Sequence, residues 1–208
     1  DLGTVGTDTV DYSKANDAIS VVVDLNTSNQ NQYVLVDNDP SVDGFDDVGD
    51  EAGDRIDVLT SVEKIVASQG ESVLDLTGST KGLEIKFKAL DVTNRVAALD
   101  RDVYTVQISD LSSATPLTRN YVEYRDAGTS GSITQATATW SRIEGSDNAE
   151  VIVLNSDHSV DDDVFNLRGG ANVVKYNELT RSITTTLSVV DWDAATPATT
   201  GVITATTT

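Results

Sequence analysis

The chain has 208 residues, of which 34 are acidic and 14 are basic, so its formal net charge is -20. It has no Cys, which excludes disulfides and zinc–thiolate sites, and a single His, which excludes a three-His metal site. The negative charge opposes contact with nucleic-acid phosphates, and no apolar run could span a bilayer as a helix, so we expect no nucleic-acid binding and no membrane insertion.

Apolar and polar residues alternate with the period of a β-strand in several runs. In chain order these runs are AISVVVDL (18–25), LEIKFKAL (83–90), VYTVQI (103–108) and SITTTLSVV (182–190). Gly, Asn, Asp and Ser separate the runs, as expected for turns. The sequence therefore predicts an all-β fold.

Four segments share a short strand, a turn and a second strand, and they begin at Val10, Leu74, Val122 and Val174. One such unit cannot bury its own apolar face, whereas units stacked in parallel about 4.8 Å apart share a core. We therefore expect one repeat-built domain over 1–208, folded as a parallel β-solenoid of the β-roll or β-helix kind. Its three tyrosines Tyr12, Tyr124 and Tyr176 would occupy one equivalent position. An antiparallel β-sandwich fits the alternation equally well.

An acidic insertion at 37–54 carries the strongest local signal for a metal site. Within it, DPSVDGFDDVGD (39–50) has oxygen-bearing side chains at the spacing of an EF-hand-like loop, namely Asp39, Ser41, Asp43, Asp47 and Asp50. Asp50 replaces the usual bidentate Glu, and no helix pattern flanks the loop. We expect a calcium loop without helices, and a solvated acidic loop is the alternative.

A second acidic cluster, NSDHSVDDDVFN (155–166), contains Asp157, Asp161 and Asp163 and the single His158. With one His, a catalytic zinc site is not expected, and calcium is the metal that this cluster favours. A surface loop is the alternative reading.

DTVDYSKANDAISVVVDLNT (8–27) and DRIDVLTSVEKIVAS (54–68) resemble segments that flank the glycine-rich repeats of repeats-in-toxin (RTX) proteins. The resemblance implies a secreted or surface-bound bacterial protein such as an adhesin or a surface-layer protein. The calcium nonapeptide G-G-x-G-x-D-x-U-x is not intact. GSDNAEVIV (145–153) has Glu150 where Asp is expected, and GGANVVKYN (169–177) has Val174 there. We therefore do not expect calcium between every pair of repeats.

No sequence feature indicates an enzyme, since there is no Gly-x-Ser-x-Gly elbow, no phosphate loop and no catalytic Cys. We expect the Thr-rich segment 194–208 to be a terminal strand or a linker. The segment VITATTT within it has no charge, so as an exposed edge strand it would favour pairing with another chain. The lack of Met favours a processed chain or a fragment. We expect an extracellular, calcium-stabilised building block of a surface layer, adhesin stalk or filament.

Such a protein would bind copies of itself, and glycans are a further expected partner. The alternatives are a carbohydrate-binding adhesion module and a β-helix enzyme that degrades polysaccharides. The first should show clustered exposed aromatic residues, and the second should show carboxylates converging in a groove.

Overall fold

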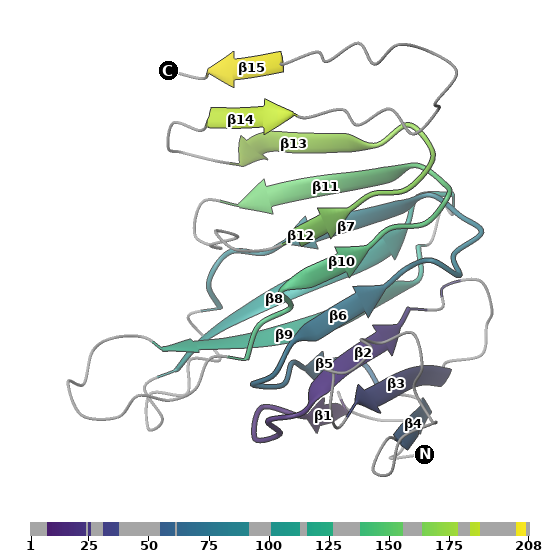
Figure 1. The fold of residues 1–208 in the computed structure, drawn as a ribbon, viewed down its shortest axis with the longest axis vertical. Coiled ribbons are helices and arrows are strands. Elements are labelled where there is room, and N and C mark those ends of the chain that lie inside the picture. The colour runs from purple at the N-terminus through teal and green to yellow at the C-terminus, as the bar shows by residue number, and fades with distance from the viewer. Residues whose placement is uncertain are drawn as a thin grey trace.

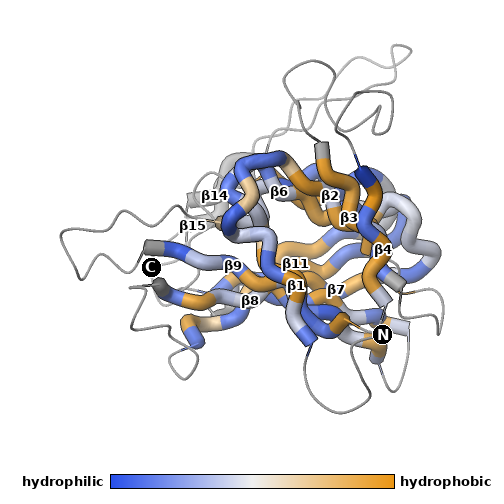
Figure 2. The backbone as a smooth tube through the Cα atoms, turned by 90° about the horizontal axis from the view of Figure 1, so that it is seen from below, coloured by the Kyte–Doolittle hydropathy of each residue, from blue (hydrophilic) through white to orange (hydrophobic). Residues whose placement is uncertain are grey.

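A computed structural model of the chain describes residues 8–23, 25, 31–37, 55–60, 62–91, 101–112, 116–126, 138–155, 164–178, 184–187 and 203–206. These residues form β-strands joined by turns, and none of them lies in a helix, which confirms the expected all-β class. Two sheets face each other as two layers, and the strands of each sheet follow one another along the long axis of the molecule (Figures 1 and 2).

The larger layer, sheet A, has seven strands in the order β1-β5-β9-β8-β7-β11-β13. Their bounds are β1 Thr9–Asp11, β5 Lys64–Val66, β7 Leu83–Phe87, β8 Arg101–Asp110, β9 Thr118–Asp126, β11 Glu150–Asn155 and β13 Val173–Glu178. The sequence of β7 shows why these strands form. Its Leu83, Ile85 and Phe87 are buried in the core, while Glu84 and Lys86 alternate with them on the outer side.

The second layer, sheet B, has six strands in the order β12-β10-β6-β2-β3-β4. Their bounds are β2 Ala18–Val22, β3 Asn31–Asp37, β4 Arg55–Thr60, β6 Ser72–Asp75, β10 Arg142–Glu144 and β12 Val164–Asn166. A separate two-stranded sheet pairs β14 (Thr184–Leu187) with β15 (Ile203–Thr206), and β15 falls within the Thr-rich segment 194–208.

Short turns carry the chain back and forth between the two sheets. The chain passes from sheet A to sheet B between β1 and β2 and between β5 and β6, and it returns to sheet A between β6 and β7, β10 and β11, and β12 and β13. Strands from successive passages through sheet B then pair in parallel, as in β2 with β6, β6 with β10 and β10 with β12. The repeated segments themselves do not stack as expected, because the segment at Val10 begins with β1 in sheet A, whereas the segment at Leu74 begins with β6 in sheet B.

Both sheets are nevertheless mixed rather than purely parallel. In sheet B the hairpin β3–β4 adds two strands beyond β2, and both of its pairings are antiparallel. In sheet A, β8 lies between β7 and β9 and is antiparallel to both. The purely parallel arrangement expected from the repeats is therefore interrupted in each sheet by antiparallel strands.

The core lies between the two sheets and consists of aligned rows of apolar side chains. One row in sheet B consists, by strand register, of Val21, Leu74, Ile143 and Phe165. One row in sheet A includes Ile85, Ile152 and Val174. Most of these side chains are fully buried and belong to one continuous cluster. Figure 2 colours the strand segments of the two sheets by hydropathy, and hydrophobic segments occur in both layers. Burial of these rows is the main stabilising contribution.

The prediction that three tyrosines share one position is wrong. Val10 aligns with Ile65 and Tyr121 across sheet A, which places Tyr12 level with Glu123 and not with Tyr124. Because successive side chains on a strand point to opposite faces, a shift of one residue separates Tyr12 and Tyr124 onto different faces. The three copies are related by topology but not residue by residue.

Candidate functional site

The metal ligands expected from the two acidic clusters lie outside the described residues. This holds for Asp39, Ser41, Asp43, Asp47 and Asp50 of the first cluster and for Asp157, Asp161 and Asp163 of the second. Among the described residues, no group of three or more His, Asp or Glu side chains could hold a metal ion.

The turn that most resembles the RTX nonapeptide, at 145–150, is described in full. Glu150 is fully buried, and its Oε1 accepts hydrogen bonds from the Ser146 backbone N–H at 3.1 Å and from the Ser146 hydroxyl at 2.5 Å. Its Oε2 is buried and has no hydrogen-bond partner. The carboxylate of Glu150, at the position of the calcium ligand in the nonapeptide, therefore forms hydrogen bonds within its own turn.

The next turn, at 167–172, packs directly on this one. The Gly169 N–H donates to the Ser146 carbonyl at 3.2 Å, and Asn172 Oδ1 accepts from the Glu150 N–H at 2.8 Å. Gly170 has φ of +76°, and a Cβ atom there would lie 2.3 Å from the Asn148 carbonyl oxygen. Backbone contacts thus bring the two turns directly against each other.

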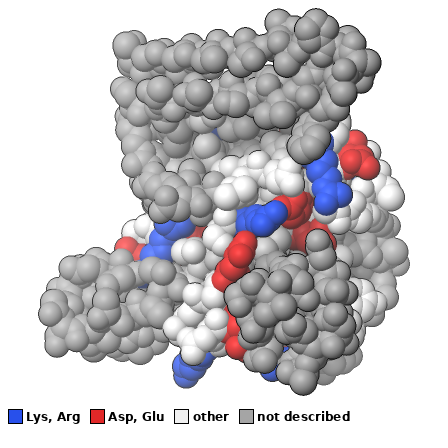
Figure 3. Space-filling view, viewed as in Figure 1, with Lys and Arg blue, Asp and Glu red and all other residues white. Residues whose placement is uncertain are grey.

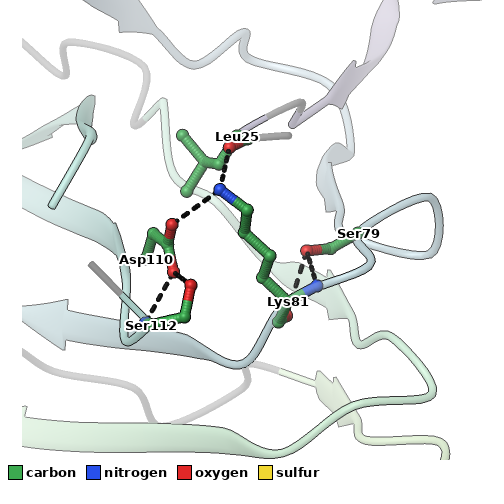
Figure 4. Close-up of polar contacts among 5 residues, drawn as sticks. All are labelled: Leu25, Ser79, Lys81, Asp110 and Ser112. Atoms are coloured by element: carbon green, nitrogen blue, oxygen red, sulfur yellow. Dashed lines mark hydrogen bonds and ion pairs between the residues drawn. The ribbon is translucent and has the colours of Figure 1, made fainter. Parts of the chain in front are cut away.

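The most developed polar site among the described residues is the ion pair of Lys81 and Asp110 (Figure 4). Lys81 Nζ donates to Asp110 Oδ2 at 2.8 Å and to the Leu25 carbonyl at 3.3 Å. Asp110 Oδ1 accepts from the Ser112 backbone N–H at 2.7 Å and from its hydroxyl at 2.6 Å. The Asp110 side chain is only 1% exposed, whereas that of Lys81 is 34% exposed.

The local sequence explains the position of Asp110 but not that of Lys81. Asp110 ends β8, and its carboxylate accepts from the N–H two residues on, as an Asx turn does. The same Asp-x-Ser/Thr pattern occurs after β1, where Ser13 N–H donates to Asp11, and after β6, where Thr77 N–H donates to Asp75. This repeated pattern is a signal in the sequence that could have identified Asp110 as a strand-end residue. Nothing local could have identified Lys81 as its partner.

The hydrogen bond from Lys81, followed by those from Ser112, lowers the pKa of Asp110 from the ordinary 3.8 to about 2. The carboxylate is therefore ionised over the physiological range. Its contacts join the turn between β6 and β7, the end of β8 and the residue Leu25 that follows β2. The ion pair is suited to holding the two sheets together at this point rather than to proton transfer.

A second buried polar group joins the sheets at the other side of the core. Tyr121 Oη donates to Gln32 Oε1 at 2.9 Å, and Gln32 Nε2 donates to the Val62 carbonyl at 2.9 Å. Tyr121 and Gln32 are 0% and 1% exposed, and burial raises the pKa of the Tyr121 hydroxyl. Tyr121 also packs edge to face on the buried Trp140, with ring centroids 5.6 Å apart. These contacts are typical of a structural core.

On the described surface seen in Figure 3, basic and acidic side chains lie beside one another rather than in separate patches. Arg142, for example, pairs with Glu144 on the outer side of sheet B. None of the described residues belongs to a helix that is long and apolar enough to cross a membrane.

Comparison with known proteins does not assign the chain to a family. No protein-family model, no curated protein and no solved structure matches the chain.

Proposed function

We propose that the protein is an extracellular structural building block, related to RTX-type surface proteins, that contributes to a surface layer, an adhesin stalk or a filament. The observation that carries the proposal is the in-register parallel series β2, β6, β10 and β12, built by a chain that passes repeatedly between two sheets. Stacking of this kind produces a rod that lengthens by repetition. We infer that the fold is a degenerate β-solenoid into which antiparallel strands have been inserted.

The polar contacts of the described residues support a structural role. The buried side chains of Asp110, Gln32 and Tyr121 are engaged in hydrogen bonds that connect strands or turns. The described aromatic residues do not suggest a sugar-binding platform, because Trp140 and Tyr121 are fully buried and the exposed Tyr33, at 40%, does not belong to a cluster of exposed aromatic residues in the described part of the chain. For these reasons a structural function is favoured over carbohydrate binding and over catalysis.

Calcium is part of the proposal through the loop at 39–50, with Asp39, Asp43, Asp47 and Asp50 as carboxylate ligands. The cluster at 157–163 is the second candidate loop. A divalent cation would offset the repulsion between these neighbouring carboxylates in a chain of net charge -20. The role of the ion would be to order the loops and not to take part in a reaction.

The experiment is thermal unfolding and size-exclusion chromatography with light scattering, in calcium, in magnesium and in chelator. Free calcium at 100 times its Kd stabilises a folded chain by about 2.7 kcal/mol. For a chain of this size that corresponds to a rise in Tm of roughly 5–10 °C. We also expect higher-order species in calcium. The double variant Asp43→Asn, Asp47→Asn should lose the rise in Tm, whereas the control Asp11→Asn should keep it.

Two results would separate the parts of this proposal. If Tm and elution are the same in calcium and in chelator, the calcium part is wrong. If the protein remains monomeric at every concentration in every buffer, the building-block function is wrong.

A further inference from the structure

A buried arginine near the start of β9 lacks the partner that its charge requires. Arg119 is only 5% exposed, and its Nε and Nη2 atoms are buried and have no hydrogen-bond partner. Removing a charged guanidinium from water without pairing it costs far more than leaving a neutral amide unpaired. The surroundings of Arg119 therefore lack a negatively charged acceptor.

The strand register places the Arg119 side chain in the space between the two sheets. Arg119 and Tyr121 are two residues apart on β9, so both side chains leave the strand on the same face, and Ile108 lies opposite Arg119 on β8. Tyr121 and Ile108 are both fully buried. Burial raises the pKa of the Tyr121 hydroxyl, and the positive charge of Arg119 opposes that rise, so the two groups lie near each other. Because Arg119 is the second residue of β9, it lies at a strand end and not in the middle of the core.

The nearest carboxylates along the neighbouring strands are engaged with other groups. Asp110, at the end of β8, accepts a hydrogen bond from Lys81 at 2.8 Å. Glu63 lies beside Arg119 in the register of β5 and β9, but its Oε2 accepts from the Asp8 N–H at 2.8 Å. The acceptor that Arg119 Nε and Nη2 lack is therefore not supplied by these two side chains.

The two unpartnered atoms indicate the shape of the acceptor. Nε and Nη2 lie on one edge of the planar guanidinium and direct two parallel N–H bonds outward, which matches the two oxygens of a carboxylate. Elsewhere on β9, the same two atoms of Arg125 donate to Glu123 Oε2 at 3.2 and 3.0 Å. One guanidinium balances the single charge of a carboxylate, whereas a doubly charged sulfate or phosphate would leave a net charge buried.

From these observations we propose that Arg119 is the anchor of a binding site for a small carboxylate ligand, which accepts two hydrogen bonds from Nε and Nη2 at this end of β9. The inference goes beyond the building-block function and does not depend on it. The carboxylate belongs either to a free aliphatic acid or to the acidic sugar of a glycan, and two probes separate these sources.

The test titrates the full chain with sodium acetate or with sodium glucuronate. Each salt replaces sodium chloride at constant ionic strength, so that charge screening does not change. NMR of isotope-labelled protein follows the Arg119 Nε–H resonance, which is assigned from its loss in Arg119→Lys. We expect a saturable downfield shift and a rise in Tm, because a ligand that binds only the folded chain stabilises it. A response to both salts indicates a sugar acid, and a response to acetate alone indicates a free aliphatic acid.

Two variants test whether the response comes from Arg119. Arg119→Met keeps an apolar side chain and removes the charge, so it should be more stable than the wild type in chloride and show no rise in Tm in acetate. Arg119→Lys keeps the charge but loses the parallel pair of donors, so it should bind acetate at least about tenfold more weakly.

The matched control is Arg142→Lys. The Arg142 side chain is 43% exposed and pairs with Glu144, so this variant should respond to acetate as the wild type does. Circular dichroism checks that each variant folds.

Three results would overturn the inference. If neither acetate nor glucuronate moves the Arg119 resonance or the Tm of the wild type, the site does not exist. If sulfate produces the same response as acetate, the ligand class is wrong. If Arg119→Met shows the same rise in Tm in acetate as the wild type, the carboxylate binds elsewhere. None of these results affects the building-block function, which light scattering tests separately.

Discussion

Tyr12 Oη donates a 2.7 Å hydrogen bond to Asp57 Oδ2, and this bond connects the end of β1 in sheet A to β4 in sheet B. Tyr12 is 7% exposed, and the Asp57 side chain, which also lies 3.5 Å from Arg55, is 33% exposed. The hairpin β3–β4 is thereby held against the first strand of the other sheet. This contact closes the end of the core that the hairpin covers.

The variant Tyr12→Phe should lower the free energy of unfolding by about 1 kcal/mol, because it removes a partly buried hydrogen bond to a carboxylate while keeping the aromatic ring. Denaturant unfolding followed by circular dichroism measures the change. Tyr33→Phe is the matched control, since Tyr33 is 40% exposed, and it should alter stability by a few tenths of a kcal/mol at most. Equal effects of the two substitutions would mean that the bond to Asp57 contributes nothing.

Stability should also fall at alkaline pH. Burial, followed by the hydrogen bond to Asp57, raises the pKa of Tyr12 above the ordinary value of 10.0, and burial raises that of Tyr121 as well. Above pH 10 the unfolded chain releases these protons while the folded chain retains them, so the unfolded state is favoured as pH rises. Each group contributes a slope of at most about 1.4 kcal/mol per pH unit. In Tyr12→Phe the decline in stability above pH 10 should be less steep than in the wild type.

The alternation of apolar residues was sufficient to predict several of the strands and, in β7, the side that is buried. LEIKF at 83–87 becomes β7 with Leu83, Ile85 and Phe87 inside. This feature follows from local periodicity, which depends only on neighbouring residues. The repeated strand–turn–strand phrase did not predict which distant segments pair, because β2, the second strand of the segment at Val10, lies beside β6, the first strand of the segment at Leu74.

Register and partner choice could not be predicted in the same way. Tyr12 and Tyr124 occupy the same place in the repeated phrase, but the chain aligns Tyr12 with Glu123, and one residue of offset reverses the face. NQYVLVD at 31–37 has the composition of any strand, and nothing in it specifies antiparallel pairing with β2. Lys81 and Asp110 are 29 residues apart and meet only because the folded sheets bring them together.

The ion pair of Lys81 and Asp110 predicts a loss of stability in acid. The pKa of Asp110 is lowered from 3.8 to about 2, so its contribution is fully present above pH 4 and is lost as pH falls through 2. Asp110→Asn should therefore destabilise the protein at pH 7, and the difference from wild type should shrink between pH 4 and pH 2. Asp147→Asn, at an exposed carboxylate, is the control and should change stability little at any pH. A difference between Asp110→Asn and wild type that is constant down to pH 2 would contradict this assignment.

Two glycine substitutions test the close stacking of the turns at 145–150 and 167–172. Gly170 has φ of +76°, and a methyl group there would lie 2.3 Å from the Asn148 carbonyl oxygen. The left-handed conformation alone costs a non-glycine residue roughly 1–2 kcal/mol, and the backbone overlap adds to this, so Gly170→Ala should lower the free energy of unfolding by at least that amount. Gly78→Ala is the control, because a Cβ atom there has no neighbour within 4 Å. A reduced entropy of the unfolded chain should leave this control within about 1 kcal/mol of wild type. If both variants unfold at the same denaturant concentration, then the turn at 167–172 does not pack on the turn at 145–150 through its backbone.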